Sequence, residues 1–324
     1  MFDTAFDAAG GFDLRKSLCS EDHDAMARSV PTRATPKRDA ETTDETYLAG
    51  NHVDVLRDRR TRGWERMSRE SIFVNKQGIL ADCARALPEV AHLPFCYQIH
   101  LNYACNQKCI MCAPGGKHGK DMLSYEDFVA RFAQVSGVAE HITLMGGEPL
   151  MYPHIDAVLD LLGQHEIAVT INTNATLLTP RIIPRLLRLH ELTLRCSVDA
   201  ATPSTYHDVR GTDVFARVAA NLRRFSAAIE HHPHVRMILV YTVMRHNLHE
   251  VVPFVDFARE LTVERVEFRP VRHVESWHVT NGTGWRFDGR EQSCGSLREE
   301  FNAVMRRAAA SCEAAGVNYH VHII

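Results

Sequence analysis

Three cysteines lie within eight residues of one another, in the segment Cys105-Asn-Gln-Lys-Cys109-Ile-Met-Cys112. Cysteine thiolates hold iron–sulfur clusters, and a four-iron cluster commonly takes four of them. A set of three leaves one iron without a protein ligand, and a catalytic cluster needs such an open coordination position. The alternative is a structural zinc site, in which His100 or His118 would supply the fourth ligand that such sites require.

A second segment with chemical potential is Met145-Gly146-Gly147-Glu148-Pro149, which follows a predicted strand. Its glycines let the backbone approach a ligand closely, and its carboxylate can meet a cation. Alone, this segment would be an ordinary turn. Its position at a strand end, after the cysteine segment, makes it a candidate binding site.

The cysteine pattern follows the first predicted strand, and in that place it resembles the cluster motif of the radical S-adenosylmethionine (SAM) superfamily. The resemblance covers about residues 96–271. It implies a [4Fe–4S] cluster held by Cys105, Cys109 and Cys112, with the amino and carboxylate groups of SAM on the open iron. The Gly-Gly-Glu-Pro segment resembles the family's motif for the SAM amino group, and Arg210 matches an arginine that meets the SAM carboxylate.

The resemblance implies further contacts with SAM. Met111 stands where the family often has an aromatic residue, and its polarizable thioether can still cover an adenine face. The segment Asn172-Thr173-Asn174-Ala175 is similar to the family's Thr-Asn-Gly turn, with Ala175 where glycine is usual. The residues expected at the SAM site, besides Arg210, are Met111, Gly146, Gly147, Glu148, Asn172, Ser197 and Val271.

Short apolar segments alternate with amphipathic ones in the middle of the chain, and these elements must position the site. The predicted strands span 98–102, 141–145, 167–172, 192–198, 235–243 and 265–270. The predicted helices span 124–137, 154–165, 179–190, 212–230, 248–261 and 295–314. Six strand–helix alternations imply parallel strands. We therefore expect an α/β fold, a partial (β/α)6 TIM barrel of parallel strands with the site at the carboxyl strand ends.

Four regions are expected along the 324 residues. Residues 1–45 are polar and show no sustained period, which predicts a disordered tail. Residues 46–95 form a helical lead-in, and residues 96–271 form the radical SAM core. Residues 272–324 hold a possible substrate lid, a helix and a final strand.

The composition is that of an ordinary globular protein. The formal net charge is −3, so a nucleic-acid partner is not favoured. No apolar run is long enough to span a membrane, and the acidic N-terminus lacks the pattern of a secretory signal. Nine unevenly spaced cysteines suit metal binding in a reducing cytoplasm better than a disulfide scaffold.

By its resemblance the chain is expected to be an enzyme that cleaves SAM reductively to a 5′-deoxyadenosyl radical, which takes a hydrogen atom from a substrate. An electron donor such as flavodoxin or ferredoxin would be a partner. The expected substrate belongs to a natural-product pathway, as a ribosomal peptide or a small sugar-like or amino-acid-like molecule. The alternatives are radical modification of a cellular protein or RNA, and a non-catalytic Fe–S or zinc protein.

The surrounding sequence resembles the branch of the family that carries a C-terminal SPASM or twitch extension, which binds auxiliary clusters. Only Cys294 and Cys312 follow the predicted barrel, so no auxiliary-cluster domain is recognisable. A natural short form and a truncated chain both stay open.

Candidate substrate contacts come from two segments. In segment 192–199 polar side chains share one face, which predicts a ligand-binding barrel interior or else an edge or solvated strand, because a covered parallel strand is normally apolar on both faces. Segment 271–294 starts at the barrel mouth and mixes aromatic, charged and glycine residues, which predicts a lid over a polar substrate or a linker packed on the barrel. The candidates are Arg195, Arg269, His273 and Trp277.

Overall fold

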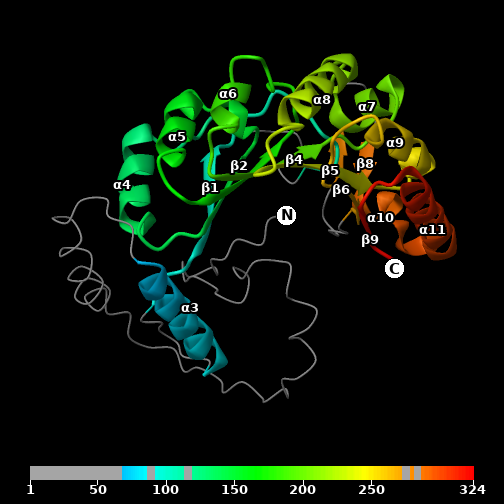
Figure 1. Cartoon of the computed structure of the whole chain (residues 1–324). Helices are drawn as coiled ribbons and strands as arrows, with labels where there is room; N and C mark the ends of the chain where they lie inside the picture. The colour runs from blue at the N-terminus through cyan, green and yellow to red at the C-terminus, as the bar shows by residue number, and fades with distance from the viewer. Residues whose placement is uncertain (1–67, 86–91, 113–118, 272–277, 281–285) are drawn as a thin grey trace, which may run out of the picture. The chain divides into compact units, whose positions relative to one another are not determined.

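The computed structural model describes residues 68–85, 92–112, 119–271, 278–280 and 286–324 (Figure 1). Its centre is a seven-stranded sheet in the order β1-β2-β3-β4-β5-β6-β9, in which every pairing from β2 to β9 is parallel. This confirms the expected α/β partial TIM barrel and adds the last strand beside β6. The strands are β1 (Cys96–Asn102), β2 (His141–Gly146), β3 (Ala168–Thr173), β4 (Glu191–Ser197), β5 (Val235–Val243), β6 (Arg265–Pro270) and β9 (Tyr319–Val321).

Apart from α3, which precedes β1, the helices lie between successive strands of the sheet, as parallel pairing requires. They are α3 (Arg69–Ala84), α4 (Tyr125–Val135), α5 (Ile155–Leu162), α6 (Ile183–Leu186), α7 (Pro203–Arg210), α8 (Phe215–Ile229), α9 (Val251–Ala258), α10 (Gly289–Gln292) and α11 (Arg298–Ala315), with short 3-10 turns at Pro149–Met151, Leu248–Glu250 and Cys294–Leu297. Within the part of the chain that the structure describes, no helix is long and apolar enough to cross a membrane.

The chain forms two compact units. The larger unit holds Gln98–Leu123 and His141–Ile324, and so contains most of the sheet and all the candidate site residues. The smaller unit includes α3 and α4. In it, Lys76 pairs with Glu140 at 2.8 Å, and the side chain of Asn75 bonds the backbone of Leu93.

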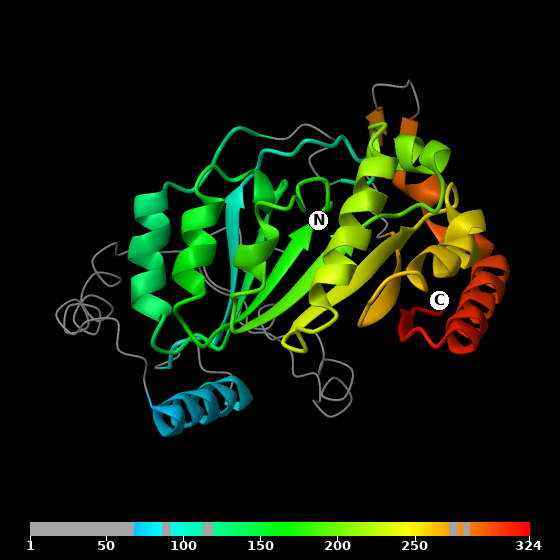
Figure 2. The same ribbon diagram turned by 45° about the horizontal axis from the view of Figure 1, so that its top comes forward.

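One face of the sheet is apolar and covered by helices. In β4 the side chains of Leu192, Leu194 and Cys196 are fully buried, and Val266 and Phe268 are buried in β6. Figures 1 and 2 show α5, α6, α8 and α9 along one side of the strands. The polar residues that alternate with these apolar ones face the inside. Because β4 lies between β3 and β5, the edge-strand alternative is wrong, whereas the polar side chains of β4 are partly exposed.

The connections around β4 differ from the prediction. Only α6 is an α-helix within the predicted segment 179–190, because Pro184 cannot donate a backbone hydrogen bond and its ring restricts the preceding turn. Between β4 and α8 the structure adds α7, which no prediction included. The hydroxyl of Thr202 caps α7 and Pro203 opens it, a recognised start signal.

The segment after β6 is partly regular. The strands β7 (His278–Thr280) and β8 (Arg286–Asp288) form an antiparallel hairpin, and α10 follows directly. Gln292, at the end of α10, accepts backbone hydrogen bonds from Arg245 and His246, which fastens this segment to the turn after β5. The predicted lid residues 272–277 and 281–285 lie outside the described residues, so the lid stays a prediction.

Candidate active site

The three cysteines lie on the loop that leaves β1 at its carboxyl end, where parallel barrels carry their sites. Cys109 is buried, while Cys105 and Cys112 are half-buried. Burial raises the pKa of Cys105 to about 11 and that of Cys112 to about 12, and the charge of Cys109 adds to both. The three sulfurs therefore lie close enough to affect one another, and binding of a metal there must displace thiol protons.

Three thiols on one loop are the donor set that a cluster with one open iron takes. Among the described residues, no three His, Cys, Asp or Glu side chains are placed to hold one metal ion. His118, one proposed zinc ligand, lies outside the described residues. A multi-iron cluster places its cysteine ligands on different metals and so spaces them more widely than one ion does.

The Gly-Gly-Glu segment packs against the chain that leads into the cysteine loop. Gly146 has a φ of 150°, and a Cβ atom there would lie 2.3 Å from the carbonyl oxygen of Asn102. A Cβ atom on Gly147 would lie 2.3 Å from the carbonyl oxygen of Ala104. The glycines thus permit a close approach of two backbones, β2 to the cysteine loop, rather than only the approach of a ligand.

Glu148 is a buried carboxylate held by three donors. Its Oε1 atom accepts from the hydroxyl of Thr173 at 2.7 Å and from the amide of Leu150 at 3.1 Å, and its Oε2 atom accepts from the amide of Asn174 at 2.7 Å. Burial outweighs these bonds and raises the pKa of Glu148 to about 7. A buried carboxylate with a raised pKa binds a cation favourably, since the cation restores the charged form.

Asn174 links Glu148 to the cysteine loop. The sequence prediction did not include Asn174 among the site residues. Besides donating its backbone amide to Glu148, it donates side-chain bonds to Asn106 at 2.8 Å and to the sulfur of Cys105 at 3.8 Å. The segment Asn172-Thr173-Asn174-Ala175 was the available signal. Ala175 has a φ of 61°, the left-handed conformation that a glycine adopts without cost.

Helix α7 holds the cysteine loop from its other side. The amides of Lys108 and Ile110 donate to the carbonyl oxygens of Arg210 and Val209 at 3.1 and 3.0 Å. These are the last residues of α7, whose carbonyl groups have no partner within the helix. The loop that carries Cys109 is therefore bonded into the carboxyl end of α7.

Arg210 brings a buried positive charge to the cysteines. Its Nη1 atom lies 3.4 Å from the sulfur of Cys109, and Nη2 lies 2.6 Å from Asp199 Oδ2. Burial opposes the charge of Arg210, yet the negative charges of Asp199 and Cys109 hold its pKa above the ordinary value. Among the described residues the buried Nε atom has no hydrogen-bond partner, so the guanidinium keeps a donor for an anion.

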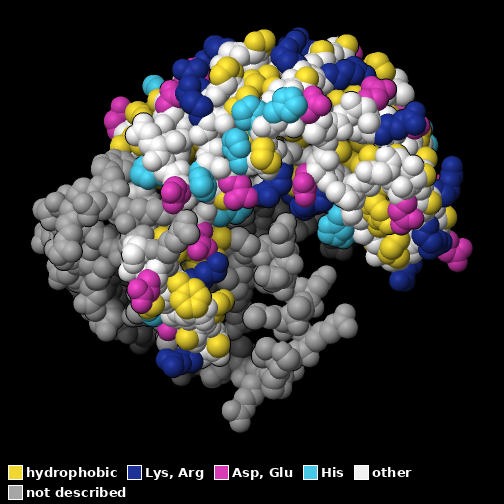
Figure 3. Space-filling view, in the orientation of Figure 1, with side chains coloured by type: hydrophobic (Ala, Val, Ile, Leu, Met, Phe, Trp, Pro, Cys, Tyr) yellow, Lys and Arg dark blue, Asp and Glu magenta, His cyan; other side chains and the backbone are white. Residues whose placement is uncertain are grey.

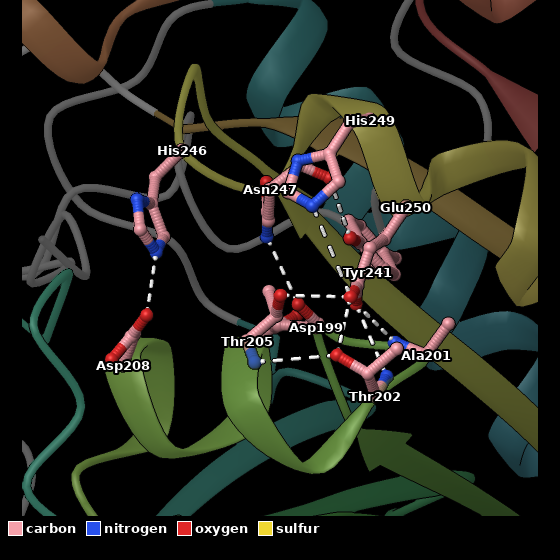
Figure 4. A network of polar contacts seen from close by, with 10 residues as sticks. All are labelled: Asp199, Ala201, Thr202, Thr205, Asp208, Tyr241, His246, Asn247, His249 and Glu250. Carbon is pink, nitrogen blue, oxygen red and sulfur yellow. Dashed lines mark hydrogen bonds and ion pairs between the residues drawn. The ribbon is translucent and has the colours of Figure 1, made fainter.

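A polar network anchors the amino end of α7 (Figure 4). The carboxylate of Glu250 accepts from the amides of Ala201 and Thr202 at 2.7 and 3.2 Å, and from the hydroxyls of Thr202 and Thr205 at 2.5 and 2.8 Å. A negative charge at a helix amino end is stabilising. Asn247 completes the network, because its side chain bonds the backbone of Asp199.

The other predicted SAM contacts lie at the same strand ends. Val271 is buried in a cluster with Ile110, Val209 and Met244, against which Met111 packs. Ser197 is the last residue of β4, and Asn172 precedes the end of β3. The structure thus brings Met111 and Val271 together beside the cysteine loop.

The predicted substrate contacts divide in two. Arg195 and Arg269 face the inside of the sheet and both pair with Glu267. His273 and Trp277 lie outside the described residues, so their role stays a prediction.

Residues 99–258 match the family model of the radical SAM superfamily. The chain belongs to this superfamily, a class of enzymes that use a [4Fe–4S] cluster and SAM. The predicted resemblance is confirmed.

Two curated relatives are mycofactocin maturases MftC. The Mycobacterium tuberculosis protein is 28% identical over 139 residues, which are 42% of this chain and 35% of the relative. The Mycobacterium ulcerans protein is 27% identical over 197 residues, which are 59% of this chain and 52% of the relative. The matches thus span about half or less of these relatives.

The structure is also similar to solved ones. A crystal structure of Streptococcus suis SuiB bound to S-adenosylmethionine superposes with a TM-score of 0.58 at 17% identity, over 76% of this chain and 54% of SuiB. At this level of identity the similarity shows the fold alone.

Proposed function

We propose that this chain cleaves SAM reductively to a 5′-deoxyadenosyl radical, which takes a hydrogen atom from a peptide substrate in a natural-product pathway. The observation that carries the proposal is the position of the cysteine loop. It lies between a buried carboxylate, Glu148, and a buried guanidinium, Arg210, at the carboxyl ends of parallel strands.

The residues of the site have separate roles in this proposal. Cys105, Cys109 and Cys112 would hold the cluster, which when bound supplies the electron that splits a C–S bond of SAM. Glu148 would accept the SAM ammonium group, and Arg210 would donate to the SAM carboxylate, since each has the opposite charge. Arg210 also lies beside Cys109 and stabilises the negative charge of that thiolate.

The peptide class of substrate is supported by the relatives rather than by the site. Two relatives bear the name maturase, and SuiB, which shares the fold, has also been solved bound to a precursor peptide, SuiA. An external electron donor, of the flavodoxin or ferredoxin kind, and a reducing cytoplasm stay parts of the proposal.

The test is anaerobic reconstitution of the chain with iron and sulfide, followed by SAM and dithionite. We expect 5′-deoxyadenosine by liquid chromatography and the brown absorbance of a four-iron cluster. Replacing Cys105, Cys109 or Cys112 by alanine should abolish both. A triple alanine variant that keeps its iron would overturn the proposal.

The matched control is Cys83→Ala, which removes a half-buried thiol from α3. This variant should keep the cluster and the product. For the substrate, a short peptide encoded beside the gene is added to the reaction, and a change of its mass supports peptide modification. If the peptide stays unchanged while SAM is still cleaved, the proposed radical chemistry stands and that peptide is excluded as the substrate.

A further inference from the structure

Three arginines surround one carboxylate on the face of the sheet opposite its apolar face. Arg195 on β4 donates two bonds to Glu267 on β6, at 3.0 and 2.5 Å. Arg265 and Arg269, two residues on either side of Glu267, approach it at 2.9 and 2.7 Å. We call Arg195, Arg265, Arg269 and Glu267 the arginine cluster.

Two guanidiniums of the arginine cluster, those of Arg195 and Arg269, share the carboxylate of Glu267, and among the described residues neither pairs with another carboxylate. The nearest acidic residue on the same face of β4, Glu191, pairs with Arg236 at the opposite end of the strands. The neighbouring positions of β5 on this face, Ile238 and Val240, are uncharged. On β9, the residue in register with Glu267 is His320, which adds no negative charge.

This positive charge is partly shielded from water. The side chain of Glu267 is 2% exposed, and those of Arg195 and Arg269 are 17% and 47% exposed. Charges at a half-buried surface attract an opposite charge more strongly than fully solvated charges do, because less water screens them. On the face seen in Figure 3, both basic and acidic side chains are scattered over the surface.

Arg269 has the capacity to bind a second anion. Its Nη2 atom meets Glu267, and among the described residues it meets no other carboxylate. A guanidinium carries five N–H donors in a planar fork that matches a carboxylate. Arg269 stands next to the end of β6, towards the barrel mouth.

The arginine cluster also lies at the same height along the strands as Asn174, which bonds Glu148. Asn172, Arg195, Ile238 and Arg265 lie in register across four neighbouring strands. Glu267 lies two residues after Arg265, and Asn174 lies two residues after Asn172, so Glu267 and Asn174 are at the same level of the sheet. Three strand spacings separate them, which is roughly 14 Å. One extended substrate can therefore reach both Glu267 and Asn174.

We propose that the arginine cluster binds a carboxylate of the substrate, mainly through Arg269. Glu267 orients the guanidiniums, and the incoming carboxylate takes the donors of Arg195 and Arg269 that Glu267 leaves free. This inference rests on the proposed function only in assigning the carboxylate to a substrate. The carboxylate is either an acidic side chain or the chain end of a peptide, and two probes distinguish them.

The test is binding of small probes to the reconstituted protein, followed by ligand-observed NMR. The first probe is N-acetylglutamate α-amide, with a side-chain carboxylate, and the second is N-acetylalanine, with a chain-end carboxylate. The neutral control is N-acetylglutamine amide. We expect one carboxylate probe to bind about tenfold more tightly than the neutral one, more weakly as salt is added.

Variants assign the binding to the cluster. Arg269→Gln should remove about tenfold of the affinity, while Glu267→Gln should raise it because the arginines lose their competitor. The matched control is Arg223→Gln on the outer helix α8, which breaks the ion pair of Arg223 with Glu260 and should change nothing. Equal binding of charged and neutral probes, or binding that Arg269→Gln leaves intact, would overturn the inference, whether or not the protein still yields 5′-deoxyadenosine.

Discussion

At the scale of single residues, Glu148 is a carboxylate that accepts several hydrogen bonds and still has a raised pKa. It is buried and bonded by three donors, and burial still raises its pKa to about 7. Near neutral pH it therefore exists in both protonation states. A bound ammonium group would favour the charged form and pull the pKa down.

Glu148→Gln should lower the affinity for SAM by about tenfold or more, because the neutral amide cannot pair with an ammonium group. The affinity of the unchanged protein should fall as the pH drops through 7, because the carboxylate then gains a proton. The variant should lose this pH dependence. Calorimetric titration of the reconstituted protein between pH 6 and 8.5 measures both effects.

Iron content is the internal control for that titration, since Glu148→Gln should leave the cysteines loaded. Glu260→Gln, an exposed change on the outer surface, should bind SAM as before. An unaltered affinity in Glu148→Gln would remove the assigned role of this carboxylate.

At the scale of elements, α7 is a short helix fastened at both ends. Glu250 binds its amino end, and its carboxyl end bonds the amides of Lys108 and Ile110 in the cysteine loop. A change at Glu250 should therefore alter the cysteine loop, although among the described residues no hydrogen bond joins Glu250 to a cysteine.

Glu250→Ala should destabilise the protein by about 2 kcal/mol, because it leaves the buried hydroxyl of Thr205 and the part-buried amides of Ala201 and Thr202 without their acceptor. Hydrogen exchange should also speed up at Lys108 and Ile110. Mass spectrometry of exchanged peptides measures this, with an exposed helix acid such as Glu299→Ala as control. Faster exchange confined to residues 201–205 would show that α7 does not transmit the change.

The elements that periodicity defines were predicted well from the sequence. The alternation in β4 places Leu192, Leu194 and Cys196 on one face, and the observed strand differs from the predicted one by a single residue at each end. α7 was missed although its Thr-Pro start was readable, because eight residues carry little amphipathic pattern. The hairpin β7–β8 was missed because three-residue strands show no measurable alternation.

The site was predictable where residue type limits the chemistry, and less so where pairing across the fold decides it. Cysteines and the Gly-Gly-Glu segment can be recognised from their neighbours in sequence. The partnership of Arg210 with Asp199 depends on how α7 folds back towards the end of β4. The Arg195 contact with Glu267 crosses 72 residues of chain and one intervening strand, and no local pattern reports it.

At the scale of the whole molecule, Glu267 ties β4 to β6 across β5. Burial alone would raise its pKa, but the bonds and charges of Arg195, with those of Arg269 and Arg265, lower the pKa to about 2. In the unfolded chain the carboxyl has its ordinary pKa near 4.5. A carboxyl whose pKa is lower in the folded state stabilises the protein above pH 4.5 and loses that contribution as the pH falls towards 2.

Glu267→Gln should therefore reduce the free energy of unfolding by up to about 3 kcal/mol at pH 6, and by progressively less below pH 4.5. Urea unfolding of both proteins at pH 6, 4 and 3 measures the difference. Glu191→Gln, a carboxylate at the other end of β4 that is 39% exposed, is the control and should change little. A difference that stays constant with pH would contradict the lowered pKa.

Asn174 contacts two parts of the site at once: its side chain bonds the sulfur of Cys105, and its backbone amide bonds Glu148. Thermodynamic reciprocity follows from such a shared contact: if the loaded cysteines hold Asn174 in the posture that SAM prefers, then SAM must hold the iron more firmly by the same free energy. The fraction of the protein that holds its metal at equilibrium would then depend on the concentration of SAM. Removal of SAM would lower that fraction, and added SAM would restore it.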